Sequence, residues 1–489
     1  MSKTARRLGP QDMLFLYGET SSTMMHVGGL MPFTPPPDAP RDFLRQLVDE
    51  SKANDVVEPW NLKLSHPDLL LSPIQSWVYD DKFDLDYHVR RSALASPGDE
   101  RELGILVSRL HSNALDLRRP PWEMHFIEGL EGGRFAIYVK MHHALIDGYT
   151  GQKMLARSLS TDPHDTTHPL FFNIPTPGRV SAVKEESGGG IAGGLLNSLG
   201  GVVSNLGGMV SGVGSALGSV AGAGRSTFDL TKALINTQLR SDNEYRNLIG
   251  SVQAPHSILN TRISRNRRFA TQQYELDRLK KIGAANDSTV NDVALAICGG
   301  SLRRFLDELG ELPEKSLIAM LPVNVRPKDD EGGGNAVAAI LGSLGTDIAD
   351  PLERLAVVTA TTRMAKAELA KMNRDAILAY TAALMAPFTM QLASALSGVK
   401  TPLPHAFNLC VSNVPGPQDV LYLRGSRMEA SYPVSLVAHS QALNITLQSY
   451  ASTLNFGFIG CRDTLPHLQR LAVYTGEALD ELEDASSGA

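Results

Sequence analysis

The sequence predicts an α/β protein built from more than one domain. At 489 residues the chain exceeds the size, about 250–300 residues, at which a single hydrophobic core stops growing. Strand-like and helix-like segments are mixed in residues 1–180 and again in residues 255–489. Between them lies a glycine-rich stretch, 181–254. We therefore expect an N-terminal domain, a connecting segment and a C-terminal domain with these limits.

The composition is that of an ordinary globular protein. Charged residues make up 20% of the chain and hydrophobic residues 43%. The net charge is −6 and no basic stripe stands out, which disfavours nucleic acid as a partner. The N-terminus has no apolar signal-peptide core, and no uninterrupted apolar run reaches the roughly 18 residues of a spanning helix. Three widely spaced cysteines, Cys298, Cys410 and Cys461, suit a reducing cytoplasm.

The first region combines strand-like and helix-like patterns. We expect strands at 25–33 and 134–141, and helices at 40–52, 103–113 and 150–159.

The second region shows the same mixture. Ser288 and Thr289 are residues that cap a helix start, and Gly310 ends the apolar face of the helix at 290–309. The other expected elements are strands at 268–276, 315–326, 443–450 and 454–460, and helices at 352–371, 375–397 and 465–482.

The connecting segment carries a helical pattern. Residues 187–224 contain no charged side chain. From Ile191 to Val220 the apolar residues recur with a mean spacing of about 3.6 residues, and the opposite face is Gly, Ser and Asn. Interior glycines weaken such a helix in water, whereas burial of the stripe in an acyl layer would offset their cost. Three interpretations stay open: a lipid-binding interfacial helix, a helix docked on the protein, and a plain linker.

The most informative motif is the histidine pair His142-His143, followed by Asp147-Gly148. The pair ends a predicted strand, and the Asp-Gly turn leads into a predicted helix. A neutral imidazole can take a proton from a hydroxyl near pH 7, and only one of two neighbouring strand residues can face a substrate. No nucleophile accompanies this base, which indicates transfer onto an incoming alcohol, amine or thiol. The alternatives are a pair of core histidines or a metal site, and the absence of a further ligand at helical spacing disfavours metal.

The motif resembles the HHxxxDG signature of the CoA-dependent acyltransferase superfamily. Nearly end to end, the chain is similar to the bacterial wax ester synthase/diacylglycerol acyltransferase family. The matching pieces are Met25–Gly29, Pro120-Pro121-Trp122-Glu123, the histidine motif, Val290-Asn291-Asp292, Pro322–Pro327 and Ser412–Pro417. One departure is Pro121, where the family often has Leu, and it leaves the preferred chain length open.

The resemblance implies two chloramphenicol-acetyltransferase-like α/β domains that face each other across a substrate channel. Acyl-CoA would enter at one end and the acceptor at the other. The resemblance assigns His143 as the base and gives Asp147 a mainly structural role, paired with an arginine. Arg326 is the candidate for that arginine, with a surface charge as the alternative.

Several residues are candidates for supporting the site. Asn291 and Asp292 lie in the first turn of a predicted helix, where they could cap the helix, orient the acyl group or stabilise an oxyanion. Asn413 either ends a strand or lines the channel.

Two further matching segments lead to structural predictions. We expect Pro121-Trp122 to pack beneath the strand that carries the histidines. We expect Gly28-Gly29 to allow a close approach of either an acyl chain or a neighbouring strand.

These observations lead to a functional expectation. The chain would transfer a long acyl group from acyl-CoA to a fatty alcohol or a diacylglycerol, with neither cofactor nor metal, and would work at a membrane or lipid-droplet surface as a peripheral protein. Three alternatives belong to other classes: a transferase of this fold with a different acceptor, a non-catalytic lipid-droplet coat protein, and a metal hydrolase.

Overall fold

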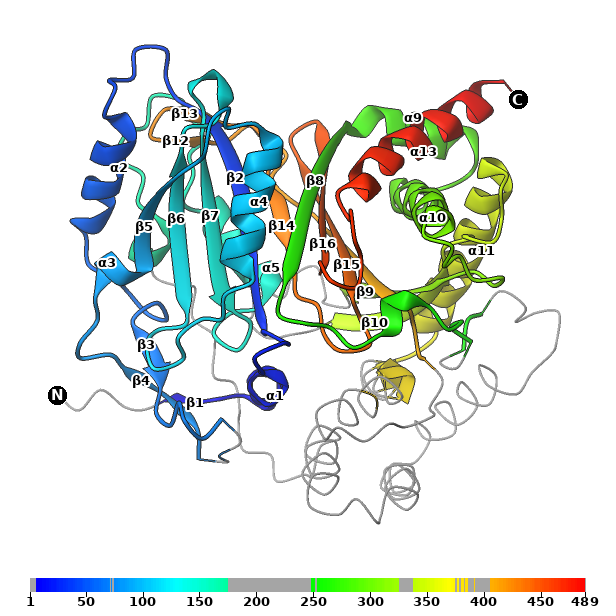
Figure 1. Cartoon of the computed structure of the whole chain (residues 1–489), viewed down its shortest axis with the longest axis horizontal. Coiled ribbons are helices and arrows are strands. Elements are labelled where there is room, and N and C mark those ends of the chain that lie inside the picture. Colours follow the sequence, from blue (N-terminus) through cyan, green and yellow to red (C-terminus); the bar gives the residue numbers. More distant parts are fainter. Residues whose placement is uncertain are drawn as a thin grey trace. The chain divides into compact units, whose positions relative to one another are not determined.

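The computed structural model describes most of the chain (Figure 1). The described residues are 6–174 except 71 and 73, 248–324 except 251 and 252, 337–373, scattered positions between 376 and 391, and 405–488. The apolar stripe at 191–220 and Arg326 therefore lie outside the described residues, as does most of the predicted helix at 375–397. Within the described part, no helix combines the length and the apolar character needed to cross a bilayer.

The chain forms two compact units, and each draws on more than one stretch of sequence. Unit 1 contains the described residues of Met1–Gly178, together with Ile263–Ile282 and Val411–Glu477. Unit 2 contains those of Arg179–Arg262, Gly283–Cys410 and Ala478–Ala489. The C-terminal half of the sequence therefore contributes strands to the unit that carries the histidine motif.

The main sheet of unit 1 has seven strands in the order β12-β13-β2-β7-β6-β5, with β14 also paired to β2. These strands are β2 (His26–Thr34), β5 (Val89–Ala93), β6 (Trp122–Glu128), β7 (Phe135–His142), β12 (Tyr422–Leu423), β13 (Ser426–Met428) and β14 (Tyr432–Val434). In Figure 1, β5, β6, β7 and β2 lie side by side in the N-terminal part of the chain. β7 is central, antiparallel to β2 on one side and to β6 on the other.

The two faces of this sheet differ in chemistry. Alternate residues of β6 and β7 point to one apolar face, which packs in a core that also holds residues of helix α2 (Phe43–Lys52). The apolar residues of these two strands are Trp122, Met124, Phe126, Ile137, Val139 and Met141. Most of the intervening residues are polar and nevertheless buried, and two of them, Tyr138 and Lys140, contact helix α4 (Glu100–His111). The buried polar residues are Glu123, His125, Tyr138, Lys140 and His142.

Smaller elements complete unit 1. A three-stranded sheet has the order β1-β4-β3, with bounds Arg6–Arg7, Ser76–Tyr79 and Leu62–Leu64. Helix α1 (Pro10–Gly18) precedes β2, and helix α5 (Gly148–Ala156) follows β7. Three antiparallel strands lie in the order β15-β16-β8, with bounds Leu443–Tyr450, Thr453–Cys461 and Arg267–Glu275. The amide N–H groups of Arg267 and Phe269 in β8 donate to the hydroxyls of Ser112, the C-cap of α4, and Ser108 within it.

Unit 2 is organised around two long helices and an antiparallel strand pair. The helices are α10 (Val290–Glu308) and α11 (Pro351–Ala370), and the paired strands are β9 (Ile318–Asn324) and β10 (Val337–Ser343). The start of β11 (Leu409–Val414) adds to β9 in parallel. A Cβ on Gly300 of α10 would lie 2.7 Å from Nη1 of Arg354 in α11. The glycine therefore allows the two helices to approach closely.

Most expected elements are present with shifts of a few residues. The strand predicted at 134–141 is β7, and the helix predicted at 465–482 is α13 (Arg470–Ser487). The helix predicted at 290–309 begins after Thr289, whose hydroxyl accepts from the amide N–H of Asp292, so its cap was predicted correctly. Several described elements were not predicted, among them the sheet strands β5 and β6, helix α1, strand β10 and helix α9 (Leu276–Ala285), which follows β8 directly.

Candidate active site

The histidine motif forms a tight turn between β7 and α5. His142 is the last residue of β7, and its carbonyl oxygen accepts from the amide N–H of Leu145 at 2.9 Å. Asp147 is the N-cap of α5, where its carboxylate accepts from the amide N–H of Thr150 at 2.8 Å and from the Thr150 hydroxyl at 2.9 Å. The motif is therefore a strand–turn–helix connection whose acidic residue caps the helix through the amide N–H of Thr150.

The structure shows a local role for Asp147 but none for Gly148. Both carboxylate oxygens of Asp147 bond Thr150, while its predicted arginine partner, Arg326, lies outside the described residues, so that pairing stays a prediction. Gly148 is the first residue of α5, and a Cβ there would meet no described atom within 4 Å. Steric crowding therefore does not explain this glycine.

His142 points into the fold. Only 1% of its surface is exposed, and its Nδ1 accepts from the amide N–H of Ala144 at 3.1 Å. Its Nε2 faces Oε2 of Glu19 at 3.4 Å. Its amide N–H donates to the carbonyl oxygen of Pro121 at 2.9 Å. Of the two histidines, this one packs behind the strand and holds the turn in place.

His143 is the histidine that remains partly exposed. Its amide N–H donates to the carbonyl oxygen of Met25 at 2.9 Å, and its ring stacks on Phe15 with 3.8 Å between the ring centroids. Nδ1 is buried and has no hydrogen-bond partner among the described residues. The exposed part of the residue therefore does not include Nδ1.

The environment keeps the His143 ring uncharged at neutral pH. Burial lowers the pKa of His143 to about 4, although the nearby Asp147 carboxylate acts in the opposite direction. A ring with this pKa is neutral at pH 7 and has a free lone pair. It can accept a proton from a hydroxyl without first losing one of its own.

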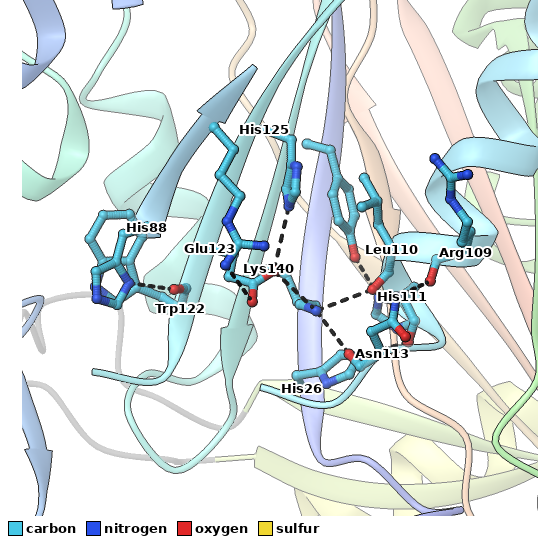
Figure 2. A network of polar contacts seen from close by, with 12 residues as sticks. His26, His88, Arg109, Leu110, His111, Asn113, Trp122, Glu123, His125 and Lys140 are labelled. Carbon is cyan, nitrogen blue, oxygen red and sulfur yellow. Dashed lines mark hydrogen bonds and ion pairs between the residues drawn. The ribbon is translucent and has the colours of Figure 1, made fainter. Parts of the chain in front are cut away.

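A buried polar network lies on the same sheet face as His142 (Figure 2). The Lys140 ammonium donates to the carbonyl oxygens of Leu110 and Asn113 at 3.1 and 2.9 Å, and lies 3.4 Å from Oε2 of Glu123. Burial opposes ionisation of Glu123, but a hydrogen bond from His125 and the charge of Lys140 lower its pKa to about 2. The lysine thereby joins the C-terminal end of α4 to β6 and β7.

Two more histidines extend this network. Nε2 of His26 donates to the carbonyl oxygen of His111 at 3.0 Å. The His111 ring lies 2.7 Å from the Tyr138 hydroxyl and donates to the carbonyl oxygen of Ser435 at 2.9 Å. Burial lowers the pKa of His111 to about 3, so this ring is neutral and serves as a structural hydrogen-bonding group.

The remaining motif pieces of unit 1 support the turn through packing. Trp122 is completely buried, and its indole N–H donates to the carbonyl oxygen of Trp60 at 2.7 Å. Pro121-Trp122 was expected beneath the histidine strand but lies beside it, because Trp122 begins β6, the strand that pairs with β7, and the carbonyl oxygen of Pro121 accepts from the amide N–H of His142. A Cβ on Gly28 would lie 2.3 Å from the carbonyl oxygen of Val139, so this glycine serves the close approach of β2 to β7.

The other candidates occupy separate places in the fold. In unit 2, Asp292 is buried and forms a capping box with Thr289, and its second oxygen accepts from the Thr362 hydroxyl at 2.7 Å. Asn291 is its half-buried neighbour in the first turn of α10. Asn413 of unit 1 is an exposed residue near the end of β11. Asp292 therefore has a capping role, whereas the roles of Asn291 and Asn413 stay predictions.

Sequence reasoning missed Phe15 and Glu19, which both contact the histidine pair. It also missed the Lys140–Glu123 network. A signal for the first helix was present, because Pro10 occupies the first helical position and the Asp12 carboxylate accepts from the amide N–H of Gly9 at 3.1 Å. Among the described residues, no three His, Cys, Asp or Glu side chains gather as metal ligands would.

Comparisons with known proteins match the chain to one family. Residues 8–294 match the wax ester synthase/diacylglycerol acyltransferase catalytic domain, and residues 333–483 match the C-terminal domain of the same family. A Mycobacterium tuberculosis protein, provisionally named a diacylglycerol O-acyltransferase, is 81% identical over 100% of this chain and 99% of its own.

Solved structures show the same relationship. The wax ester synthase/diacylglycerol acyltransferase from Marinobacter aquaeolei VT8 matches with a TM-score of 0.75 and 34% identity, over 99% of this chain and 100% of that one. The first condensation domain of the calcium-dependent antibiotic synthetase matches with a TM-score of 0.55 at 13% identity, over 100% and 97%, which shows a shared fold only.

The mixed α/β fold and the strand–turn–helix histidine motif define a two-domain acyltransferase. Within that class, the chain belongs to the wax ester synthase/diacylglycerol acyltransferase family.

Proposed function

We propose that this acyltransferase moves a long acyl group from acyl-CoA to the hydroxyl of a fatty alcohol or a diacylglycerol, with His143 as general base. The observation that carries the proposal is the state of one ring. His143 is partly exposed, has a buried Nδ1 and is neutral at pH 7 because burial lowers its pKa to about 4. The names of the family and of the 81% identical relative support the two acceptor classes.

The proposed reaction proceeds by direct attack. Nε2 of His143 takes the proton of the bound hydroxyl as its oxygen attacks the thioester carbonyl carbon. The tetrahedral intermediate then collapses, its carbon–sulfur bond breaks, and the protonated ring returns the proton to the departing CoA sulfur. The products are an ester and CoA, and neither a metal nor a cofactor takes part.

No acyl-enzyme is required in this scheme. Cys298, Cys410 and Cys461 are all buried, and burial raises the pKa of Cys298 to about 12, which keeps it as an unreactive thiol. The oxyanion of the tetrahedral intermediate needs fixed hydrogen-bond donors. The side-chain amide of Asn291 or a main-chain N–H is our proposal for that donor.

Replacement of His143 tests the assignment. His143→Ala is expected to lower CoA release from palmitoyl-CoA and hexadecanol by about 10²–10⁴-fold, the usual contribution of a positioned base. His164→Ala changes an exposed histidine and serves as the matched control. Turnover near that of the wild type in folded His143→Ala would refute the base assignment.

A competition experiment between two acceptors identifies the acceptor class. Palmitoyl-CoA is offered hexadecanol and a diacylglycerol together, and the products are separated by chromatography. We expect wax ester, triacylglycerol or both. The absence of both products, with CoA released onto another acceptor, would reject the proposed acceptor class and leave the acyltransferase intact.

We further propose that the protein works at a lipid surface, because both acceptors are too apolar to dissolve freely. The apolar stripe in the sequence from Ile191 to Val220 supports this proposal. Flotation with phospholipid vesicles is expected for the wild type and is expected to be lost when Leu199, Leu206 and Val213 are changed to Asp. Equal flotation of the two proteins would reject the stripe as the lipid contact.

A further inference from the structure

One short segment outside the histidine motif contacts both of its histidines. Phe15 lies in the last turn and a half of α1, and Glu19 is the C-cap residue of the same helix. The Phe15 ring stacks on His143, while the Glu19 carboxylate faces His142. The two residues are four positions apart, about one helical turn, so a single helix end presents both contacts.

The contact between Glu19 and His142 has a defined polarity. Nδ1 of His142 accepts a hydrogen bond from the amide N–H of Ala144, so it carries no hydrogen and the neutral ring is protonated on Nε2. That nitrogen lies 3.4 Å from Oε2 of Glu19. Both side chains are buried, with 1% and 9% of their surfaces exposed. Nε2 forms no hydrogen bond among the described residues, so the carboxylate faces its N–H as a nearby negative charge.

The same carboxylate also reaches His143 through the main chain. Oε2 of Glu19 accepts from the amide N–H of Met25 at 2.5 Å. The carbonyl oxygen of Met25 in turn accepts from the amide N–H of His143 at 2.9 Å. One peptide segment therefore links Glu19 to the main chain of His143 through two consecutive hydrogen bonds.

Glu19 interacts with two buried cations. Its carboxylate interacts electrostatically with Lys140 of β7 and with Arg267 of β8. The Arg267 guanidinium is buried and donates to the carbonyl oxygen of Ser22 at 2.6 Å, which fixes the loop between Glu19 and Met25. Contacts of Glu19 itself and of the loop that follows it therefore hold the carboxylate in place.

We propose that Glu19 is a positioning residue for His143 in the acyl transfer. It fixes the ring of His142 behind the turn and, through Met25, the main chain of His143, while Phe15 fixes the plane of the catalytic ring. The inference rests on the proposed role of His143. It predicts that the loss of Glu19 affects the chemical step and leaves substrate binding unchanged.

The test is the steady-state kinetics of Glu19→Gln in the full-length protein. The amide oxygen can take the position of Oε2, the atom that meets both Met25 and His142, so this substitution removes the negative charge that faces the His142 N–H and the two buried cations. We expect kcat to fall about 10- to 100-fold, as a small misplacement of a catalytic group does, while KM for palmitoyl-CoA stays within about twofold. Glu131→Gln, on an exposed glutamate, is the matched control and is expected to behave as the wild type.

A second variant separates positioning from general damage. If Glu19 acts through His142, Glu19→Gln should lower kcat much less in a His142→Gln background than in the wild type, because contacting residues are not additive. If Glu19→Gln does not fold, Glu19→Asp replaces it. Its shorter side chain draws the carboxylate away from His142 and is expected to lower kcat at least about threefold with KM unchanged.

The outcomes distinguish this inference from the proposed function. Wild-type kcat in folded Glu19→Gln, or in Glu19→Asp where that variant is used, overturns the positioning role even when His143→Ala is inactive. Additive effects of Glu19→Gln and His142→Gln overturn the part of it that acts through His142. Turnover by His143→Ala overturns the base assignment itself, and the positioning role with it.

Discussion

The two faces of the β6–β7 sheet are made from alternating residues of the same strands, yet they are held together differently. One face packs Trp122, Ile137 and Met141 in a continuous apolar core. The other buries Glu123, Lys140 and His142 beneath α4. The apolar face tolerates small changes of volume at modest cost, whereas the polar face depends on every charge keeping its partner. His142 is the last residue of the polar face, so the geometry of the histidine turn depends on the charged groups of that face.

Loss of Lys140 should produce the largest effect. Lys140→Met leaves the buried Glu123 carboxylate without its ammonium partner and is expected to cost about 3–5 kcal/mol in the free energy of unfolding, measured with urea. Lys82→Met, on an exposed lysine, is the control. A cost below about 1 kcal/mol would show that the polar face does not depend on this pair. Adding Glu123→Gln to Lys140→Met should recover part of the loss.

Acid should weaken the polar face. Burial lowers the pKa of His111 to about 3, below the value of about 6.5 expected for an unfolded chain. The unfolded state therefore binds the proton first as the pH falls, and stability present above pH 6.5 declines by about 1.4 kcal/mol per pH unit for each such histidine. His26 acts in the same direction, as does His88, which stacks on Trp122 on the apolar side. Equal unfolding free energies at pH 7.5 and 5.5 would contradict this.

Ile137→Val measures the apolar face. One buried methylene is lost, and the expected cost is about 0.5–1.5 kcal/mol. Because no charge is involved, the difference from the wild type should be the same at pH 7.5 and 5.5. A cost that grows on acidification would mean that the two faces are not independent.

Asp147→Asn should have the smallest effect on stability. Asparagine is as good an N-cap as aspartate, so the free energy of unfolding should change by less than about 0.5 kcal/mol. The Asp147 carboxylate raises the pKa of His143, so the loss of its charge lowers that pKa further. The acid limb of kcat/KM should therefore move to lower pH, and a shift to higher pH would contradict the electrostatic account.

The difference between the faces also explains what the sequence could predict. The histidine turn was predictable because all its parts are local: the apolar alternation of β7, the Asp-Gly turn and the helical pattern of α5. The α10 start was predictable for the same reason, since Thr289 and Asp292 are three residues apart. In each case a short stretch of sequence contains both partners of the interaction.

The polar network could not be predicted in this way. Alternation in β6 and β7 indicates a polar face but does not show that α4 covers it, because a solvated face has the same pattern. Glu19 and His142 are separated by more than a hundred residues, and no periodicity connects them. Arg326 and the stripe at 191–220 lie outside the described residues, and their predicted roles stay predictions.

The pH dependence of kcat/KM tests the central claim most directly, because this quantity reports the ionisation of the free enzyme. The substrates are palmitoyl-CoA and hexadecanol, and enzyme that is returned to pH 7 serves as a check on its stability. The account predicts a constant kcat/KM between pH 6 and 8. Activity should fall only as the pH approaches the His143 pKa of about 4. An acid limb centred near pH 6.5, absent from a variant that lacks His143, would show an ordinary exposed imidazole and contradict the account.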